Sequence, residues 1–326
     1  MAVFNNSTAS EGPSEVVLVK DANYEKMIQS LIIAVGFVGV INNGLVFLVV
    51  YRVQTLRTLS NFFVVSQAAI DLVSSVAIVL VHLIPINSVP DGLAGEFLCR
   101  VWVSRFVMWG SLYASTYNLL VLTYERYFAI LYPLKYVAFF NKNKAILTML
   151  VTWVLSFSYA SFAFSLVVRG DGYCARVSLG LMRQRVMGTA VFLINYLIPV
   201  FSMSYAYVRM GKELKDLPAQ PSSLGQDTSM VRARRNIYKT LCLVFAAFVV
   251  CWTPNQVLFL LYNISAALFY DERLMNFTVI LLYCNCTVNP VIYALKYRQF
   301  RVGLKMTFCG GNEVNPEHAT TNQIIP

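Results

Sequence analysis

The longest uncharged stretch of the chain decides its fold. Residues 240–270 read TLCLVFAAFVVCWTPNQVLFLLYNISAALFY, which is 31 residues without Asp, Glu, Lys or Arg. A helix of about 20 apolar residues crosses the hydrocarbon core of a bilayer. Comparable stretches occupy 27–51, 106–124, 145–168, 186–208 and 274–295, and a further one, 61–90, is interrupted only by Asp71. None shows the alternation of a barrel strand. The sequence therefore predicts an all-α membrane protein, a bundle of seven transmembrane helices.

The composition of the chain agrees with this fold class and excludes others. Of its 326 residues, 57% are hydrophobic and only 13% are charged, whereas about 25% of the residues of a soluble domain are charged. A soluble globule could not cover its surface with so few charges, and the same numbers exclude intrinsic disorder. We expect no nucleic-acid partner despite the net charge of +10, because a basic patch requires a soluble body to carry it.

Positive charge is divided unevenly between the two sides of the predicted membrane. The connections after the first, third, fifth and seventh helices carry 16 Lys and Arg, and the opposite side carries 8. Cytoplasmic loops are the basic ones, so the N-terminus is predicted to lie outside. We expect a multi-pass protein of the plasma membrane with three parts. These are an extracellular tail at 1–26 glycosylated at Asn5 or Asn6, a transmembrane domain at 27–296, and a short amphipathic eighth helix with a cytoplasmic tail at 297–326, where Cys309 is a candidate for palmitoylation.

Two cysteines lie on the predicted outer side. Cys99 begins the third helix, and Cys174 lies in the loop between the fourth and fifth helices. Disulfides persist in the oxidising environment outside the cell. Since these are the only two outer cysteines, we expect a bridge that ties this loop over the mouth of the bundle.

Asp71 is the only acid in the middle of a predicted span. Asn43, Ser115, Asn285 and Asn289 are polar residues of other spans that could meet it. Carboxylate, hydroxyl and amide oxygens suit a hard cation. They equally suit a polar network that holds the helices together, and the spacing alone leaves both interpretations open.

Short motifs on every span resemble the rhodopsin-like (class A) G-protein-coupled receptors. The motifs, in chain order, are Asn43, Asn61 with Asp71, Cys99, Glu125-Arg126-Tyr127, Trp153, Pro199 with Tyr207, Phe248 with Cys251-Trp252-Thr253-Pro254, and Asn289-Pro290-Val291-Ile292-Tyr293. The region around Asp71 is similar to the family's pattern Asn…Leu-Ala-x-x-Asp. The resemblance implies a receptor in the plasma membrane that activates heterotrimeric G proteins.

The resemblance also implies roles for residues at three depths. An allosteric sodium pocket would consist of Asp71, Ser115, Trp252, Asn285 and Asn289. An inner switch that meets the G protein would consist of Glu125, Arg126, Tyr127, Tyr207 and Tyr293. The connector between them would consist of Thr116, Pro199 and Phe248. Apart from sodium, no cofactor is expected.

The chain departs from the family pattern at two places that bear on these roles. Arg234 stands where some members carry an acid that locks the sixth helix to the third, so an ionic lock of that kind is not expected. Cys99 lies 27 residues before Arg126, about two more than is usual, which shifts the register of the outer end of the third helix.

The ligand pocket is expected at the outer end of the bundle. Its predicted residues are Arg105, Met108, Trp109, Leu112, Asn255, Gln256, Phe259, Val279 and Tyr283. Met108 falls where amine receptors carry an Asp, and a buried amine without a counter-ion would be strongly penalised. The loop above is basic, with Arg169, Arg176, Arg183 and Arg185. Because the third and sixth helices resemble those of invertebrate neuropeptide receptors, we expect a neuropeptide; the alternative is a lipid or another small acidic ligand.

Other functional classes are disfavoured by what the sequence lacks. A transporter would show inverted repeats or broken helices, and a channel would show rings of charge. The chain has two histidines, His82 and His318, and no Ser/His/Asp or metal-ligand cluster, so an enzyme is not expected.

Overall fold

The computed structural model describes residues 22–86, 88–216, 228–265, 271–296 and 298–309. The predicted glycosylation sites Asn5 and Asn6 lie outside these residues, and so does most of the predicted tail at 297–326.

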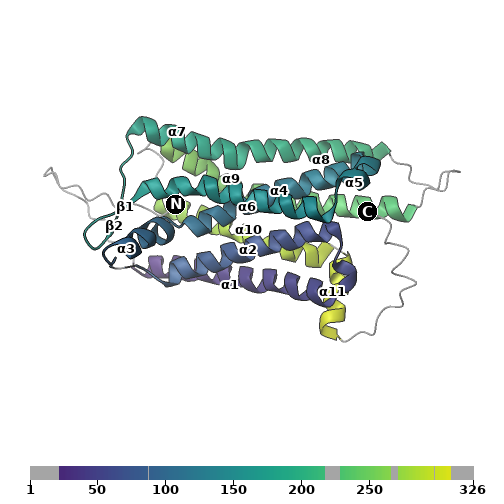
Figure 1. Ribbon diagram of the computed structural model, residues 1–326, viewed down its shortest axis with the longest axis horizontal. Coiled ribbons are helices and arrows are strands. Elements are labelled where there is room, and N and C mark those ends of the chain that lie inside the picture. The colour runs from purple at the N-terminus through teal and green to yellow at the C-terminus, as the bar shows by residue number, and fades with distance from the viewer. Residues whose placement is uncertain (1–21, 87, 217–227, 266–270, 297, 310–326) are drawn as a thin grey trace.

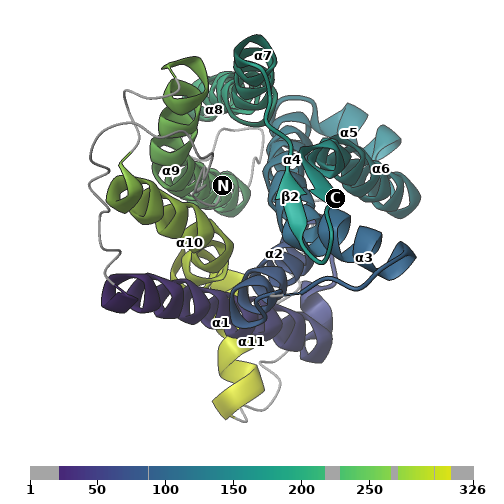
Figure 2. The ribbon, with the colours of Figure 1, turned by 90° about the vertical axis from the view of Figure 1, so that its left-hand side faces the viewer.

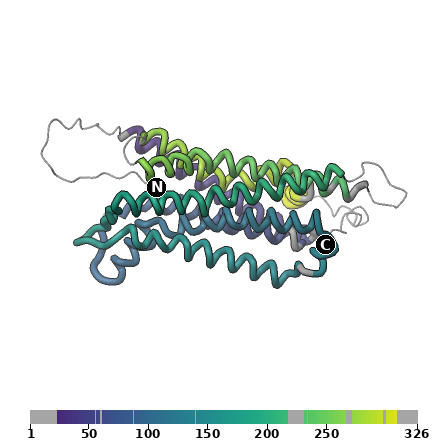
Figure 3. Tube along the Cα trace, turned by 90° about the horizontal axis from the view of Figure 1, so that it is seen from above, coloured from purple at the N-terminus to yellow at the C-terminus, as the bar shows by residue number. Residues whose placement is uncertain are grey.

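Long helices run side by side along the length of the molecule (Figures 1 and 3). They are α1 (Ala22–Arg52), α2 (Leu59–Leu83), α4 (Phe106–Leu131), α6 (Lys142–Ala160), α7 (Leu181–Phe192), α8 (Ile198–Asp216), α9 (Thr228–Ser265) and α10 (Glu272–Lys296). A short π-helical turn, η4 (Leu193–Leu197), joins α7 to α8 so that the two form one continuous span. The predicted bundle of seven transmembrane helices is therefore confirmed.

The central helix α4 carries many buried polar side chains. Within the described residues, the six other spans are long and apolar enough to cross a membrane by composition alone. The 26 residues of α4 include several polar side chains that are all buried: Ser111, Ser115, Thr116, Asn118, Thr123, Glu125 and Arg126. Because α4 packs against α2, α6 and α8, these groups meet other helices instead of lipid. By contrast, large apolar side chains such as Phe37, Val154 and Phe201 are exposed on the outside of the bundle, as a lipid-facing surface requires.

One end of the bundle is covered by a small hairpin. Its strands β1 (Val167–Arg169) and β2 (Cys174–Arg176) pair antiparallel, with Val167 opposite Arg176. A disulfide joins Cys174 to Cys99, whose Cα atoms are 5.5 Å apart, and thereby fastens the hairpin to the start of the third span. The predicted bridge is confirmed, and the hairpin lies across the end of the bundle (Figure 2). The same end holds α3 (Leu93–Phe97), the π-helical turn η2 (Leu98–Val103) and the 3-10 turn η3 (Ser161–Leu166).

The opposite end carries three short helices, η1 (Gln54–Leu56), α5 (Pro133–Phe139) and α11 (Arg298–Cys309). The last of these turns away from the bundle axis (Figure 1) and packs on α1 and α10, with Phe300 buried. The predicted eighth helix is thus confirmed. Cys309 is its last residue, but its side chain lies outside the described part of the chain, so palmitoylation stays a prediction.

Candidate functional sites along the bundle

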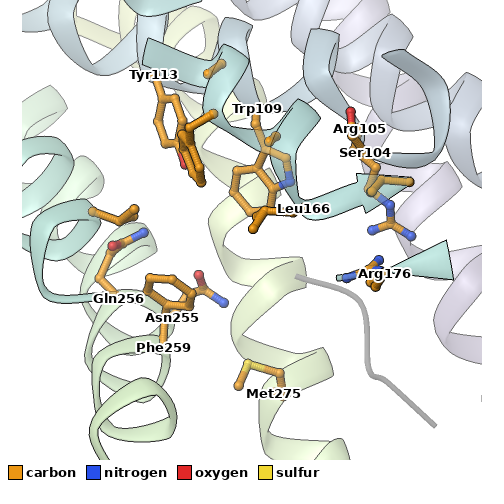
Figure 4. A pocket seen from close by; sticks show the side chains of 15 residues that line it. Ser104, Arg105, Trp109, Tyr113, Leu166, Arg176, Asn255, Gln256, Phe259 and Met275 are labelled. Carbon is orange, nitrogen blue, oxygen red and sulfur yellow. The ribbon is translucent and has the colours of Figure 1, made fainter. Parts of the chain in front are cut away.

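A cavity opens beneath the hairpin, between α4, α7, α9 and α10. Its volume is about 840 Å³, including the part that is open to solvent. Side chains of α4, α9 and α10 around it are labelled in Figure 4, and α7 contributes Val191. The lining consists of Ser104, Arg105, Trp109, Tyr113, Ala160, Phe162, Ala163, Leu166, Val167, Arg176, Val191, Asn255, Gln256, Phe259 and Met275.

Two arginines lie side by side at one wall of this cavity (Figure 4). Arg105 precedes α4 and adopts the left-handed conformation (φ 58°), which is uncommon for a residue other than glycine. Arg105 follows the π-helical turn η2. The spacing from Cys99 to Arg126 is about two residues longer than usual, and the wide turn η2 and the left-handed Arg105 take up this extra length. Arg176 stands on β2, two residues after the disulfide.

The arginine pair concentrates positive charge at the mouth of the cavity. Partial burial and the neighbouring charge of Arg105 lower the pKa of Arg176 to about 10, so the side chain is still protonated at neutral pH. Two of the acids at this end are already bound to other arginines: Asp91 pairs with Arg169 at 2.6 Å, and Glu96 pairs with Arg100 at 2.8 Å. An anion entering the cavity would relieve the repulsion between Arg105 and Arg176.

The facing wall carries two adjacent amides of α9. Asn255 Nδ2 donates a hydrogen bond to Thr278 Oγ1 of α10 at 3.3 Å. Gln256 is 3% exposed, and among the described residues no donor reaches its Oε1 atom. Trp109 and Tyr113, one turn apart on α4, stack between the two walls with ring centroids 6.1 Å apart. From one wall to the other, the cavity is therefore lined by two arginines, two aromatic rings and an amide oxygen without a described donor.

Five of the nine residues predicted for the pocket line this cavity: Arg105, Trp109, Asn255, Gln256 and Phe259. The other four do not line it. Met108, Leu112, Val279 and Tyr283 are buried in the packed core instead, where the Tyr283 hydroxyl donates to Met108 Sδ at 3.4 Å. The ring of Tyr283 fills the space between α10 and α4, which counting along a helix could not reveal.

Ten of the fifteen lining residues were not predicted for the pocket, and two of these carry polar groups that bear on the site. Arg176 was expected in the basic roof, and the structure places it in the cavity wall. Tyr113 was missed, although it lies one turn after Trp109 and therefore on the same face of α4.

Asp71 is the centre of a buried polar network halfway along the bundle. Ser115 Oγ donates to Asp71 Oδ1 at 2.7 Å, and Asn289 Nδ2 donates to Asp71 Oδ2 at 2.9 Å. A residue that the sequence reasoning missed, Gln67, also contacts both carboxylate oxygens through its Nε2 atom, at 3.2 and 3.1 Å. Asp71 and Gln67 are 0% and 1% exposed, so solvent does not share these acceptors.

Three further residues predicted around Asp71 are buried without a hydrogen bond to it among the described contacts. Asn43 Nδ2 donates instead to the carbonyl oxygens of Gly39 and Cys286, at 2.9 and 2.8 Å, and so ties α1 to α10. Trp252 packs on Phe248, with ring centroids 5.5 Å apart. Asn285 is buried on α10. Of the predicted sodium ligands, the structure thus gathers Ser115 and Asn289 around the carboxylate.

Arg126, at the inner end of α4, is held by a contact with its neighbour in the sequence. Arg126 Nε lies 3.0 Å from Glu125 Oε2. The Tyr136 hydroxyl of α5 donates to Glu125 Oε1 at 2.5 Å. Arg126 and Tyr293 line the same small cavity, of about 350 Å³, facing Ile237, Thr240 and Leu241 of α9. Tyr127, the third residue of this motif, is buried between the rings of Tyr124 and Tyr132.

Helix α9 is fastened to α8 at this end. Arg235 Nη2 donates to the Leu214 carbonyl oxygen at 3.0 Å, and the Tyr238 hydroxyl donates to the Tyr207 carbonyl oxygen at 3.2 Å. The Tyr207 hydroxyl bonds Thr123 Oγ1 at 3.1 Å, and its ring stacks on Phe245 at 5.2 Å. Arg234 makes none of the described ion pairs. The polar contacts that Arg235 and Tyr238 make between α9 and α8 go to backbone carbonyl oxygens.

The predicted connector residues are all buried between the outer and inner sites. Thr116 Oγ1 donates to the Leu112 carbonyl oxygen of its own helix at 3.3 Å. Pro199 stands just after the π-helical turn η4, as expected because it offers no N–H to the preceding turn. Phe248 contacts Trp252, which lies one helical turn below Gln256 of the cavity.

The chain is similar in sequence to known seven-helix proteins. The family model described as "7 transmembrane receptor (rhodopsin family)" matches residues 42–293. Galanin receptor 2b of Danio rerio is 29% identical over 88% of this chain and 77% of its own length. A QRFP-like peptide receptor of Branchiostoma floridae is 25% identical over 88% and 78%, and the histamine H2 receptor of Cavia porcellus is 24% identical over 91% and 84%.

Proposed function

Because the chain belongs to the rhodopsin family of seven-transmembrane receptors, we propose that it binds an extracellular neuropeptide that carries an acidic group and thereby activates heterotrimeric G proteins. The observation that carries this proposal is the outer cavity, in which Arg105 and Arg176 face the amides of α9 across Trp109 and Tyr113. Receptors for galanin and for a QRFP-like peptide are among its relatives.

The chemistry of the two walls favours a peptide over the alternatives. Paired guanidinium groups recognise a carboxylate by charged hydrogen bonds, and the Gln256 oxygen, which has no donor among the described residues, is an acceptor for a peptide N–H. A lipid or small organic acid would use the arginines and the aromatic rings but would leave the Gln256 oxygen buried and unsatisfied, at a cost of about 1–3 kcal/mol. An amine finds no carboxylate among the residues that line this cavity, although one relative is a histamine receptor.

The distribution of charge supports the orientation that this function requires. The hairpin end, with its disulfide, would face the outside, and the end with α5 and α11 would face the cytoplasm, where the more basic connections lie. The N-terminus is accordingly proposed to be extracellular and the chain to reside in the plasma membrane. Arg126 and Tyr293, at the cytoplasmic end, are then the side chains that a G protein would meet.

Signalling is proposed to be a shift between two arrangements of the bundle. A ligand that spans the cavity contacts α4, β2 and α9 together, and it favours whichever arrangement gives it better contacts. Trp252 and Phe248 lie below Gln256 on α9. Pro254 lies inside this continuous helix and has no N–H to donate to the preceding turn. Movement of the inner half of α9 away from α8 would break the Arg235 and Tyr238 contacts and open the small cavity around Arg126.

The proposal is tested with matched ligand sets on cells that express the full chain. One set contains neuropeptides with free carboxylates, a second contains the same peptides as carboxamides, and a third contains fatty acids and other small organic acids. G-protein dissociation is the readout. We expect agonists in the first set, weaker or no response to their carboxamides, and none in the third. Agonists confined to the third set would replace the peptide by the lipid alternative, and agonists without any acidic group would remove the role of the arginines.

Substitution of the arginines identifies the group that binds the acid. Arg105→Gln and Arg176→Gln are each expected to weaken the acidic agonist by about tenfold or more, since a charged hydrogen bond contributes about 1.5–3 kcal/mol, and to affect the carboxamide of the same peptide much less. Arg183→Gln is the matched control, because Arg183 is exposed on α7 and does not line the cavity. Equal losses for both forms of the peptide would contradict a direct contact.

A further inference from the structure

The partner of the buried Asp71 carboxylate is an internal amide. Gln67 lies four residues before Asp71 on α2, so both side chains are on the same face of the helix. In the pattern Asn…Leu-Ala-x-x-Asp, to which this region is similar, the corresponding position is a leucine. This chain therefore places a hydrogen-bond donor where the pattern has a hydrocarbon side chain.

The Gln67 amide occupies the acceptors that a cation would need. Its Nε2 atom lies 3.2 Å from Asp71 Oδ1, 3.1 Å from Asp71 Oδ2 and 2.6 Å from Ser115 Oγ. Ser115 Oγ and Asn289 Nδ2 also donate to the carboxylate, at 2.7 and 2.9 Å. Each carboxylate oxygen thus accepts hydrogen bonds from two donors, and the Ser115 oxygen accepts one as well.

A chain of side chains fixes the direction in which the Gln67 amide points. Gln67 Oε1 accepts a hydrogen bond from Asn118 Nδ2 at 2.8 Å. Asn118 Nδ2 also faces the Phe63 carbonyl oxygen at 3.5 Å, and Asn118 Oδ1 accepts from Ser66 Oγ at 3.0 Å. Turning the Gln67 amide around would set its oxygen against the Asp71 carboxylate and its NH2 group against that of Asn118. All of these side chains are buried, so water could not compensate for the lost bonds.

This arrangement does not fit a sodium ion at Asp71. A hard cation binds through oxygen lone pairs, whereas here N–H groups point at the carboxylate from Gln67 and Asn289. We propose that Gln67 takes the place of the cation, so that the Asp71 carboxylate is stabilised by hydrogen bonds from within the bundle and the receptor does not respond to sodium. The proposal concerns the state of the bundle itself and does not depend on which ligand the outer cavity binds.

The full chain is purified in detergent, and its thermal unfolding is measured once in sodium chloride and once in choline chloride of equal ionic strength. For the wild-type protein we expect the same unfolding temperature in both salts. For Gln67→Leu we expect a higher unfolding temperature in sodium than in choline, by several degrees and increasing with sodium concentration, because a ligand that binds the folded state stabilises it. The double variant Gln67→Leu with Asp71→Asn is expected to lose this response, which assigns it to the carboxylate.

A second variant keeps the test informative if Gln67→Leu does not fold. Asn118→Ala removes the donor to Gln67 Oε1 and frees the amide to turn its oxygen towards a cation, so a sodium-dependent increase is expected there as well. A wild-type protein that is stabilised by sodium would overturn the proposal. So would the absence of a sodium response in both single variants, or a response that persists without Asp71, because Gln67 would then not be the group that keeps sodium away.

Discussion

Gly39 shows how little space separates α1 from α2. A Cβ atom at Gly39 would overlap Ser75 Oγ and lie 3.0 Å from Ser75 Cβ, whereas a Cβ atom at Gly44 of the same helix would meet nothing within 4 Å. Ser75 is itself held by a bond from its hydroxyl to the Asp71 carbonyl oxygen, at 2.7 Å. We expect Gly39→Ala to lower the stability of the detergent-solubilised protein by about 1–3 kcal/mol, as overpacking of a core does.

Gly44→Ala is the matched control for this prediction. It makes the same chemical change on the same helix without a clash, so it is expected to be neutral or to raise the stability by up to about 1 kcal/mol through helix propensity. Both are read from thermal unfolding with a fluorescent probe. Equal unfolding temperatures for the two variants would show that α1 can withdraw from α2 at no cost.

Single side chains were predictable from the sequence where their chemistry is rare in a membrane. Asp71 is an acid inside a span, and polar partners on neighbouring helices, Ser115 and Asn289, do meet it. Gln67 was not predicted as a partner of Asp71, although it lies one turn before it on α2 and stands where the pattern Asn…Leu-Ala-x-x-Asp has a leucine. The contact between Met108 and Tyr283 was not predictable, since helical periodicity gives the direction of a side chain but not the neighbour that it meets.

The disulfide-bonded hairpin determines whether Arg176 reaches the cavity. Because β2 begins at Cys174 and the bridge holds it to Cys99, loss of either sulfur releases the same hairpin. We expect Cys99→Ala and Cys174→Ala to reduce surface expression equally, with a stability loss of about 2–5 kcal/mol, and the double variant to be no worse than either. Flow cytometry of an epitope-tagged receptor measures this, and clearly unequal losses would argue against a shared cause.

The sequence predicted the helices of the bundle but not their ends. Uncharged stretches marked residues 186–208, whereas the span runs from Leu181 to Asp216, because a helix continues past the membrane wherever its backbone is capped and hydrated. The break before α4 was indicated only by the spacing of Cys99 and Arg126. The sequence pattern near Cys99 did not predict the π-helical turn η2 or the left-handed conformation of Arg105, both of which lie where the chain packs beneath the hairpin.

At the scale of the whole molecule, the two ends of the bundle are in different states. The outer end has a solvent-accessible cavity lined by Arg105 and Arg176. At the inner end Arg126 is 8% exposed, and the acid that it pairs with, Glu125, is in its own helix. No described ion pair links Arg126 to α9. In the mechanism proposed above, the bonds from Arg235 and Tyr238 to backbone oxygens of α8 must break before the inner end can open.

Removing one of these bonds is expected to raise signalling without a ligand. Arg235→Ala deletes donors that lie 3.0 and 3.3 Å from the Leu214 carbonyl oxygen, and a bond from a charged group contributes about 1.5–3 kcal/mol. Because that bond must break when α9 leaves α8, its loss favours the open arrangement, and basal G-protein dissociation is expected to increase severalfold at equal surface expression. Arg232→Ala removes an exposed arginine one turn earlier on the same helix and is expected to leave basal signalling unchanged. An equal increase in both variants would indicate a general effect of charge at the membrane surface, and no increase in either would mean that other contacts keep the inner end closed.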